Sequence, residues 1–327
     1  MTACSSTPMP SRIPVQSRFC TAQISPLGAI LHDLWFNLPG GRAFSPLAEA
    51  DWAGKVAPGS VPDLSPHLVE LGGEWPCVPF GTSSADPQHH GFCSNADWTL
   101  EETDGRTARL AITYPDGHDI ASVRREIRLC DDRPAVEFLL DITPARDCLL
   151  PIGLHPIFRV PDSAAGGSLV WRGGEQATTI PAELAPPGMA LLPGTTVTKG
   201  GGIPTRDGAN VTFPAEFTQQ REALVQIWDC DGQFELRYGA EGAGVRLTWS
   251  TEDFPHCLLW LANPGAPIPG LGQFTGLGVE PVSSLFDRGV MPFDPVLEGR
   301  KAGVELRAGH IWRTRYEISA FALGQEA

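Results

Sequence analysis

The sequence of 327 residues lacks the features that mark secreted, membrane-spanning and nucleic-acid-binding proteins. No window approaches the roughly 18 consecutive apolar residues of a membrane-spanning helix. The polar run of residues 1–18 lacks the apolar core of a secretory signal. Lys and Arg number only 24 against 38 Asp and Glu, and the net charge of −14 opposes binding to a polyanion. We therefore expect a cytoplasmic protein with no nucleic-acid or membrane partner.

The eight cysteines are widely spaced and include no CxxC pair, which favours reduced thiols over a disulfide framework. Most of them are expected to be buried. His89, His90 and Cys93 could form half of a metal site, but no second group of ligands has suitable spacing, so no metal site is predicted. Lys199 precedes a run of glycines, the reverse of the order in a P-loop, and nucleotide binding has no support.

Glycine and proline are abundant, at 36 and 31 residues, whereas helical periodicity is weak throughout. This composition is typical of strands joined by tight turns, and it predicts an all-β fold with few short helices. The best candidates for short helices are residues 48–55 and 214–221. We expect residues 1–20 to be a flexible N-terminal segment and residues 21–327 to form a single domain.

Several segments have the composition and length of β-strands: 107–114, 121–129, 135–142, 223–228, 234–238, 245–250 and 257–262. Turn residues at 115–117 and 131–134 join the first three, which predicts an antiparallel meander. Residues 166–208 are rich in Gly, Pro and Thr and are expected to be irregular. Residues 304–318 are expected to form a closing hairpin.

Three short motifs carry candidate acid–base residues: His89-His90-Gly91-Phe92, Gly153-Leu154-His155-Pro156 and Gly278-Val279-Glu280-Pro281. One carboxylate and two histidines from Gly- or Pro-containing turns suit proton transfer at a small neutral substrate, because one group must take a proton while another gives one. Each has a plainer interpretation, in which Glu280 is a solvated turn residue and His155 is a hydrogen-bonded structural histidine. The apolar neighbours of Glu280 favour the functional interpretation.

With these motifs in this order, and Trp98 after the first, the chain resembles the aldose 1-epimerase (galactose mutarotase-like) family. The resemblance covers nearly the whole chain. It implies a β-supersandwich of large antiparallel sheets and a shallow cleft that binds a pyranose ring. One of Trp75, Trp98, Trp228 and Trp260 is expected to stack on the sugar.

The resemblance also implies roles for three residues. Glu280 would be the base that removes the anomeric hydroxyl proton, and His155 the acid that protonates the ring oxygen. His90 would bind the substrate. We expect Glu280 and His155 to face each other with about the width of a sugar ring between them. No metal or organic cofactor is needed, and the partner would be a small-molecule carbohydrate.

Two departures from the family's pattern bear on substrate binding. The segment 72–81 lacks the family's arginine, and Glu74, the one charged residue there, is a substitute substrate contact. Cys93-Ser94 stands where a second arginine often follows. The family's sugar-binding aspartate corresponds to Asp229 or Asp207. The missing arginines leave a non-catalytic carbohydrate-binding or sensing protein as the alternative function, and the shortage of Arg and Lys disfavours a phosphorylated hexose.

Overall fold

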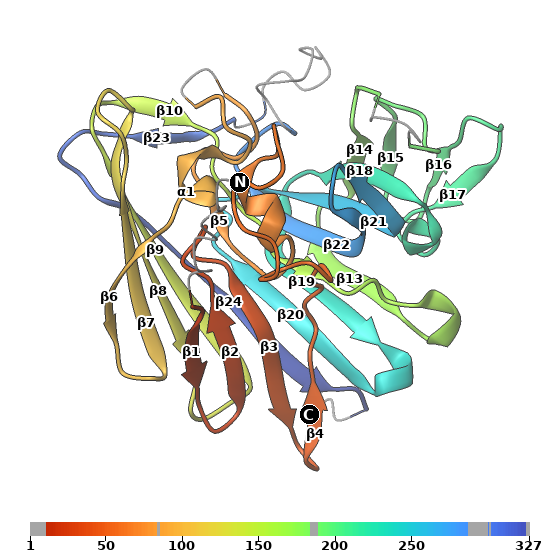
Figure 1. Cartoon of the computed structure of the whole chain (residues 1–327). Helices are drawn as coiled ribbons and strands as arrows, with labels where there is room; N and C mark the ends of the chain where they lie inside the picture. Colours follow the sequence, from red (N-terminus) through yellow and green to blue (C-terminus); the bar gives the residue numbers. More distant parts are fainter. Residues whose placement is uncertain (1–10, 84–85, 184–188, 287–299, 301, 325–327) are drawn as a thin grey trace, which may run out of the picture.

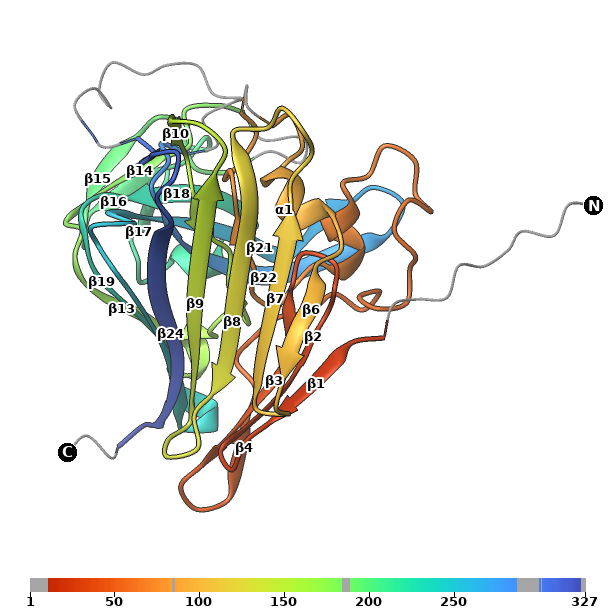
Figure 2. The ribbon, with the colours of Figure 1, turned by 90° about the vertical axis from the view of Figure 1, so that its left-hand side faces the viewer.

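The computed structural model describes residues 11–83, 86–183, 189–286, 300 and 302–324. Two eight-stranded antiparallel sheets dominate it (Figure 1). The first, here called the long sheet, runs in the order β13 (Ser168–Gly173), β19 (Cys230–Tyr238), β20 (Ala243–Trp249), β24 (Trp312–Ala322), β9 (Ala135–Pro144), β8 (Ile120–Leu129), β7 (Thr107–Thr113) and β6 (Thr99–Thr103). Figure 2 shows β24, β9, β8 and β7 lying side by side along one flank of the molecule.

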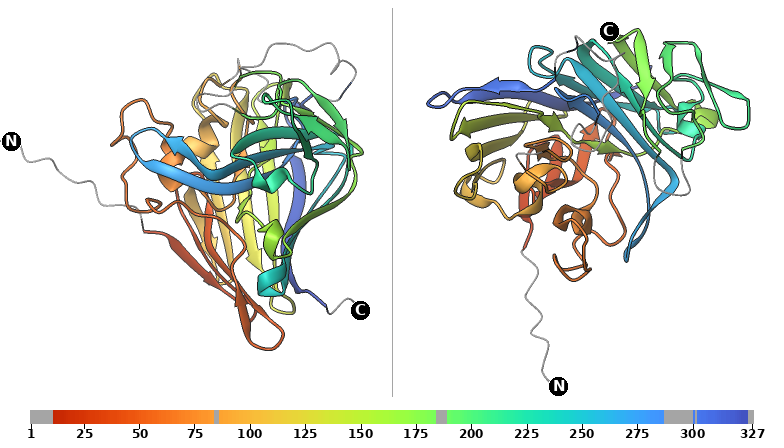
Figure 3. Two further views of the ribbon diagram at one scale, coloured as in Figure 1. Left: turned by 90° about the vertical axis from the view of Figure 1, so that its right-hand side faces the viewer. Right: turned by 90° about the horizontal axis from the view of Figure 1, so that it is seen from above.

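The second sheet carries the candidate site and is called the site sheet. Its order is β15 (Thr196–Thr198), β14 (Gln176–Thr179), β18 (Glu222–Ile227), β21 (His256–Ile268), β22 (Gly272–Val282), β11 (Gly153–Leu154) and β5 (Pro76–Cys77), with β12 (Ile157–Phe158) also paired to β22. The left panel of Figure 3 shows β21 and β22 crossing in front of the strands of the long sheet.

Smaller elements pack around these two sheets. Four strands form a separate sheet, β1 (Ile13–Gln16), β2 (Cys20–Ile24), β3 (Leu31–Leu38) and β4 (Arg42–Phe44), and two pairs stand apart, β10 (Cys148–Leu150) with β23 (Val304–Leu306) and β16 (Gly202–Pro204) with β17 (Asn210–Thr212). Strand β3 contacts the central strand β24 of the long sheet. The described helices are short: α1 (Gly91–Asn95) and the 3-10 turns η1 (Pro66–Glu70), η2 (Ser163–Ala165), η3 (Phe217–Gln219) and η4 (Gly239–Glu241).

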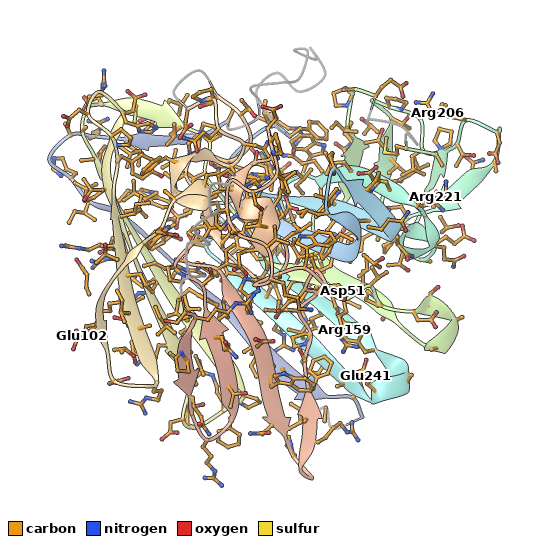
Figure 4. All side chains as sticks on the ribbon, viewed as in Figure 1. Asp51, Glu102, Arg159, Arg206, Arg221 and Glu241 are labelled. Atoms are coloured by element: carbon orange, nitrogen blue, oxygen red, sulfur yellow. The ribbon has the colours of Figure 1, made fainter. Side chains whose placement is uncertain are left out.

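Period-two burial explains why the long sheet has one apolar face. Along β9, buried residues alternate with partly exposed ones, as expected where successive side chains point to opposite faces of a strand. By contrast, β22 is buried continuously from Gly276 to Val282, so it is covered on both faces. Among the labelled charged residues of Figure 4, Glu102 and Arg206 lie at the periphery.

The predicted all-β class and the meander of β7, β8 and β9 are confirmed. The strands predicted between residues 223 and 262 also exist, but they divide between the sheets: β18 pairs with β21, and β19 pairs with β20. The described cysteines are all free and, except for the half-buried Cys148, buried. No helix in the described ranges is long and apolar enough to cross a membrane.

Four expectations about local structure were wrong. Residues 166–208 contain β13 to β16, because strands of three to six residues are too short to show clear alternation. The closing hairpin does not form, since β23 pairs with β10 while β24 pairs with β9 and β20. Residues 48–55 hold turns instead of a helix, and only the 3-10 turn η3 forms within 214–221.

The N-terminal boundary also differs from the expectation. Within the segment expected to be flexible, β1 begins at Ile13 and pairs in register with β2. Arg12 is held by carboxylates as well, with Nη2 at 2.7 Å from Glu70 Oε2. The folded part therefore starts before residue 21, and residues 1–10 lie outside the described part of the chain.

Candidate active site

A cavity of about 350 Å³ opens beside the central strands of the site sheet. The described residues that line it include four histidines, the aromatic side chains of Trp75, Phe80 and Trp260, three glutamates and seven aliphatic side chains. Glu280, His155 and His90, predicted from the three sequence motifs, all belong to this lining. The fold therefore brings together three residues from distant parts of the chain, of which Glu280 is more than a hundred positions from both histidines.

Glu280 and His155 are in direct contact at the base of the cavity. Glu280 lies on β22, and His155 directly follows β11, which pairs with β22. The His155 backbone N–H donates a hydrogen bond of 2.8 Å to the carbonyl of Trp75, which fixes the position of the residue. Its Nε2 lies 3.5 Å from Glu280 Oε1, with both residues buried. We expected about the width of a sugar ring between the two side chains. They are closer than that, because their backbones approach each other in one sheet.

Gly278 makes room for the Glu280 carboxylate. The two residues lie on the same face of β22, since they are two positions apart. A Cβ atom at position 278 would collide with Glu280 Oε1. The glycine of the Gly-Val-Glu-Pro motif therefore lets the side chain of Glu280 lie over the strand, close to His155.

Stacking fixes the orientation of the His155 ring. It lies parallel to the Trp75 indole, with centroids 4.1 Å apart and an interplanar angle of 10°. The His90 ring packs against it edge-on at 4.8 Å. Within the described residues, neither His155 Nδ1 nor Glu280 Oε1 has a hydrogen-bond partner. Buried polar atoms are normally satisfied, so such atoms beside a cavity are candidates for contact with a ligand.

His90 is held at the start of α1 in the left-handed conformation, with φ of 61°. Its Nδ1 accepts a hydrogen bond from the backbone N–H of Gly81 at 3.3 Å. In the neutral ring the proton must then reside on Nε2. The adjacent Gly91 has φ of +77°, and a Cβ there would collide with the Val78 carbonyl. The backbone conformation therefore requires the glycine of the His-Gly pair, while the histidine belongs to the cavity lining.

His67 is a cavity residue that the sequence interpretation missed. Its Nδ1 lies 2.8 Å from Asn95 Oδ1, an acceptor, which leaves Nε2 as the acceptor of the neutral ring. The Asn95 amide donates to the carbonyls of His89 and Gly91. Nothing around His67 in the sequence indicates this position, because the site is completed by a contact between η1 and α1.

Burial controls the protonation of these groups. It raises the pKa of Glu280 well above the ordinary 4.5. It lowers the pKa of His155 well below 6.5, and the nearby His67 and His89 lower it further. The pKa of His90 is also lowered by burial and by its histidine neighbours, and that of His67 falls to about 3. Burial thus favours the protonated form of the Glu280 carboxyl and the neutral form of the His155 imidazole, which are adjacent at the base of the cavity.

Glu74 does not line the cavity. Its carboxylate lies in the fully buried core, where it accepts hydrogen bonds from Arg125 and, at 2.7 Å, from the Tyr316 hydroxyl. Arg125 also donates to the carbonyl of Ala29 at 2.5 Å. The expected sugar contact is therefore replaced by an ion pair between the sheets, because the side chain points away from the cavity.

The two aspartates also lie outside the cavity lining. Asp229 is exposed and accepts a hydrogen bond of 2.8 Å from Arg300. Asp207 is an exposed turn residue that binds the Thr205 hydroxyl and the Ala209 amide. Trp75 and Trp260 line the cavity, so two of the four tryptophans face it, not one.

The histidine pair near Cys93 does not form a metal half-site with it. The Cys93 thiol donates to the carbonyls of Pro76 and Val78, at 3.5 and 3.9 Å. In the part of the chain that the structure describes, no group of three His, Cys, Asp or Glu residues is arranged to hold a metal ion.

No family model and no curated protein matches this sequence. Solved structures do match. The galactose mutarotase related enzyme of Lactobacillus acidophilus has a TM-score of 0.61 at 13% identity, covering 97% of this chain and 99% of its own. The aldose epimerase homologue of C. elegans has a TM-score of 0.57 at 13% identity, covering 96% and 99%. A galactose mutarotase-like protein of Lactobacillus casei has a TM-score of 0.57 at 15% identity, covering 95% and 100%. The chain thus has the galactose mutarotase-like β-sandwich fold, as its motifs predicted.

Proposed function

We propose that this protein is a cofactor-independent aldose 1-epimerase, which interconverts the α and β anomers of an aldose. The observation that carries the proposal is the buried contact of 3.5 Å between Glu280 Oε1 and His155 Nε2 at the base of a cavity. A carboxyl and an imidazole that reach two oxygens bonded to the same carbon can take a proton from one and give a proton to the other in the same step.

The chemistry suits groups that lie side by side. In a pyranose, the anomeric hydroxyl oxygen and the ring oxygen are both bonded to C1. Glu280 takes the proton from the anomeric hydroxyl, the C1–O bond of the ring breaks, and His155 gives a proton to the released ring oxygen. The product is the open-chain aldehyde. Rotation about the bond between C1 and C2, followed by the reverse transfers, closes the ring as the other anomer.

One proton shared by the pair is enough for this cycle. Burial favours placing this proton on Glu280 in the free protein, because it raises the pKa of the carboxyl and lowers that of the imidazole. Transfer of the proton across the contact produces a carboxylate base and an imidazolium acid without a proton from solvent. The pair then titrates as a unit with two apparent pKa values.

Two neighbours have supporting roles in this proposal. His90, whose Nδ1 is occupied by the Gly81 amide, presents Nε2–H as a donor to a sugar oxygen. Trp75 stacks on one face of the His155 ring and keeps the imidazole from rotating away from Glu280. These contacts would hold the acid in place through the reaction.

Exchange NMR on purified protein with glucose, galactose and other aldoses tests the proposal. Acceleration of anomer exchange above the spontaneous rate, lost in Glu280→Gln while sugar binding persists, is the expected result. The Gln side chain keeps the shape of Glu but cannot act as a base. Binding without acceleration in the wild type would overturn the proposal in favour of a carbohydrate-binding protein.

A further inference from the structure

The polarity of the cavity floor changes from one strand of the site sheet to the next. In the register of the site sheet, Glu280 on β22 is opposite Leu258 on β21, and Gly278 is opposite Trp260. Trp260 is in turn opposite Leu224 on β18. Directly opposite residues on antiparallel strands share a face of the sheet. The floor thus passes from the acid–base pair to an apolar strip of Leu258, Trp260 and Leu224.

The walls continue the apolar strip. Leu68 and Leu71 border the cavity from η1 and the chain that follows it, and Ile180 borders it from the chain after β14. Polar groups collect elsewhere, in the histidine cluster, where the rings of His89 and His90 lie 3.9 Å apart and those of His67 and His90 5.6 Å apart. The cavity therefore has a polar wall formed by the histidines, and its floor is apolar outside the acid–base pair.

The described lining contains no Lys or Arg, and its charged groups are Glu183, Glu222 and Glu280. Glu183 is already paired with Arg206. Glu222 receives the hydrogen bond of the Trp260 indole, and burial raises its pKa. A phosphate has no cationic partner among these residues. A sugar hydroxyl placed on Leu258 or Leu224 meets an apolar side chain, and the Trp260 indole N–H between them is already donated to Glu222.

We propose, resting on the proposed function, that the substrate is a neutral aldose with an apolar exocyclic group, such as a 6-deoxyaldose, whose methyl group lies on Leu258, Trp260 and Leu224. The ring hydroxyls face the histidine wall. A hydroxymethyl group at the same place would bury a hydroxyl without a partner, which is unfavourable.

Matched sugars test the proposal on the wild-type protein. The pairs are glucose with 6-deoxyglucose and galactose with 6-deoxygalactose, with glucose 6-phosphate as the anionic member, and kcat/KM for anomer exchange is measured by NMR. We expect the deoxy sugar of a pair to be favoured by about 10- to 100-fold, the range over which an apolar pocket rejects an added hydroxyl. Glucose 6-phosphate should be slower than glucose. Equal rates within both pairs, or faster reaction of the phosphate, would overturn the proposal.

Binding is measured in parallel, so that the two proposals can fail separately. If no sugar is accelerated, the epimerase proposal fails, and the same pairs are compared by saturation-transfer NMR. A deoxy preference in binding would still support the apolar site, and equal binding would overturn it. Leu224→Asn should reduce the deoxy preference about tenfold. Leu100→Asn, on the edge strand β6 and outside the cavity lining, is the matched control and should leave the preference unchanged.

Discussion

Glu74 and Glu280 are both buried carboxylates in a β-sandwich core, yet their surroundings differ. Glu74 accepts hydrogen bonds from a guanidinium and a phenol, and Arg125 beneath it also lies 5.1 Å from the centre of the Phe138 ring. Glu280 has one close polar neighbour in the described structure, the His155 imidazole, and beyond it a cavity.

The difference separates two uses of the same side chain. A buried carboxylate with a charged partner links the elements that carry the two groups, here the segment before β5 with β8 and β24. Burial raises the pKa of both carboxyls, but at Glu74 the contacts with Arg125 and Tyr316 oppose the rise, whereas burial is the single cause at Glu280. Burial alone therefore does not distinguish the two glutamates, whereas an unsatisfied oxygen and an adjoining cavity make Glu280 the candidate for the proposed base.

The sharpest test of this contrast is Glu280→Gln. Removal of a general base reduces rates by about 10²- to 10⁴-fold, so we expect kcat for anomer exchange to fall within that range. The urea midpoint should change little, because the amide fills the same volume and no ion pair is lost. A large loss of stability with unchanged kcat would assign Glu280 to the structural class.

Glu74→Gln should show the opposite behaviour. Breaking a buried ion pair leaves an uncompensated charge, and the free energy of unfolding should fall by about 3–5 kcal/mol in urea titrations. At temperatures where the variant is folded, anomer exchange should stay near the wild-type rate. Glu137→Gln is the matched control, because Glu137 pairs with Arg128 and Arg133 at the surface and should cost at most about 1 kcal/mol.

Gly278→Ala examines how finely the Glu280 carboxylate is positioned. The added Cβ occupies the place of Oε1, so the carboxylate must move. A displacement of about 1 Å can reduce a rate by about 10²-fold, and we expect kcat to fall by that order. Gly276→Ala is the control, because its Cβ would press on Ile157 and Phe274 and not on the Glu280 carboxylate. Equal losses of rate in both variants would refute a specific role for Gly278.

The smallest expected effect is on the pH dependence of stability. The pKa of His67 is lowered to about 3 from 6.5, so between these values the unfolded chain binds a proton that the folded protein does not. The contribution of His67 to the free energy of unfolding is therefore fully present above pH 6.5. It decreases as the pH is lowered from 6.5 toward 3, by about 1.4 kcal/mol per pH unit for one histidine. In urea titrations between pH 4 and 6, His67→Gln should show a shallower slope than the wild type. Identical slopes would show that His67 is not held neutral.

Local patterns were informative where the chemistry is encoded within a few residues. The alternation in β7, β8 and β9 predicted the meander, and the motifs around His90, His155 and Glu280 predicted three residues that share one cavity. Glycines contributed to this success, because the backbone at Gly91 and the space at Gly278 admit no other residue without a collision.

Assignments that depend on distant partners could not be made in the same way. Glu74 is charged and lies in a motif-like segment, which suggested a ligand contact, but Arg125 is 51 positions and Tyr316 242 positions away from it. His67 has its partner Asn95 28 positions away. Periodicity indicates which face of a strand is buried, but it does not indicate which side chains contact that face.

The sequence by itself thus predicts an all-β protein with one carboxylate and two histidines suited to proton transfer. The folded arrangement alone distinguishes Glu280 from Glu74, adds His67, and lays Leu258, Trp260 and Leu224 beside the acid–base pair. The physical reason is that pKa, hydrogen-bond satisfaction and cavity lining depend on groups within a few ångströms in space, and these come from segments far apart in the chain.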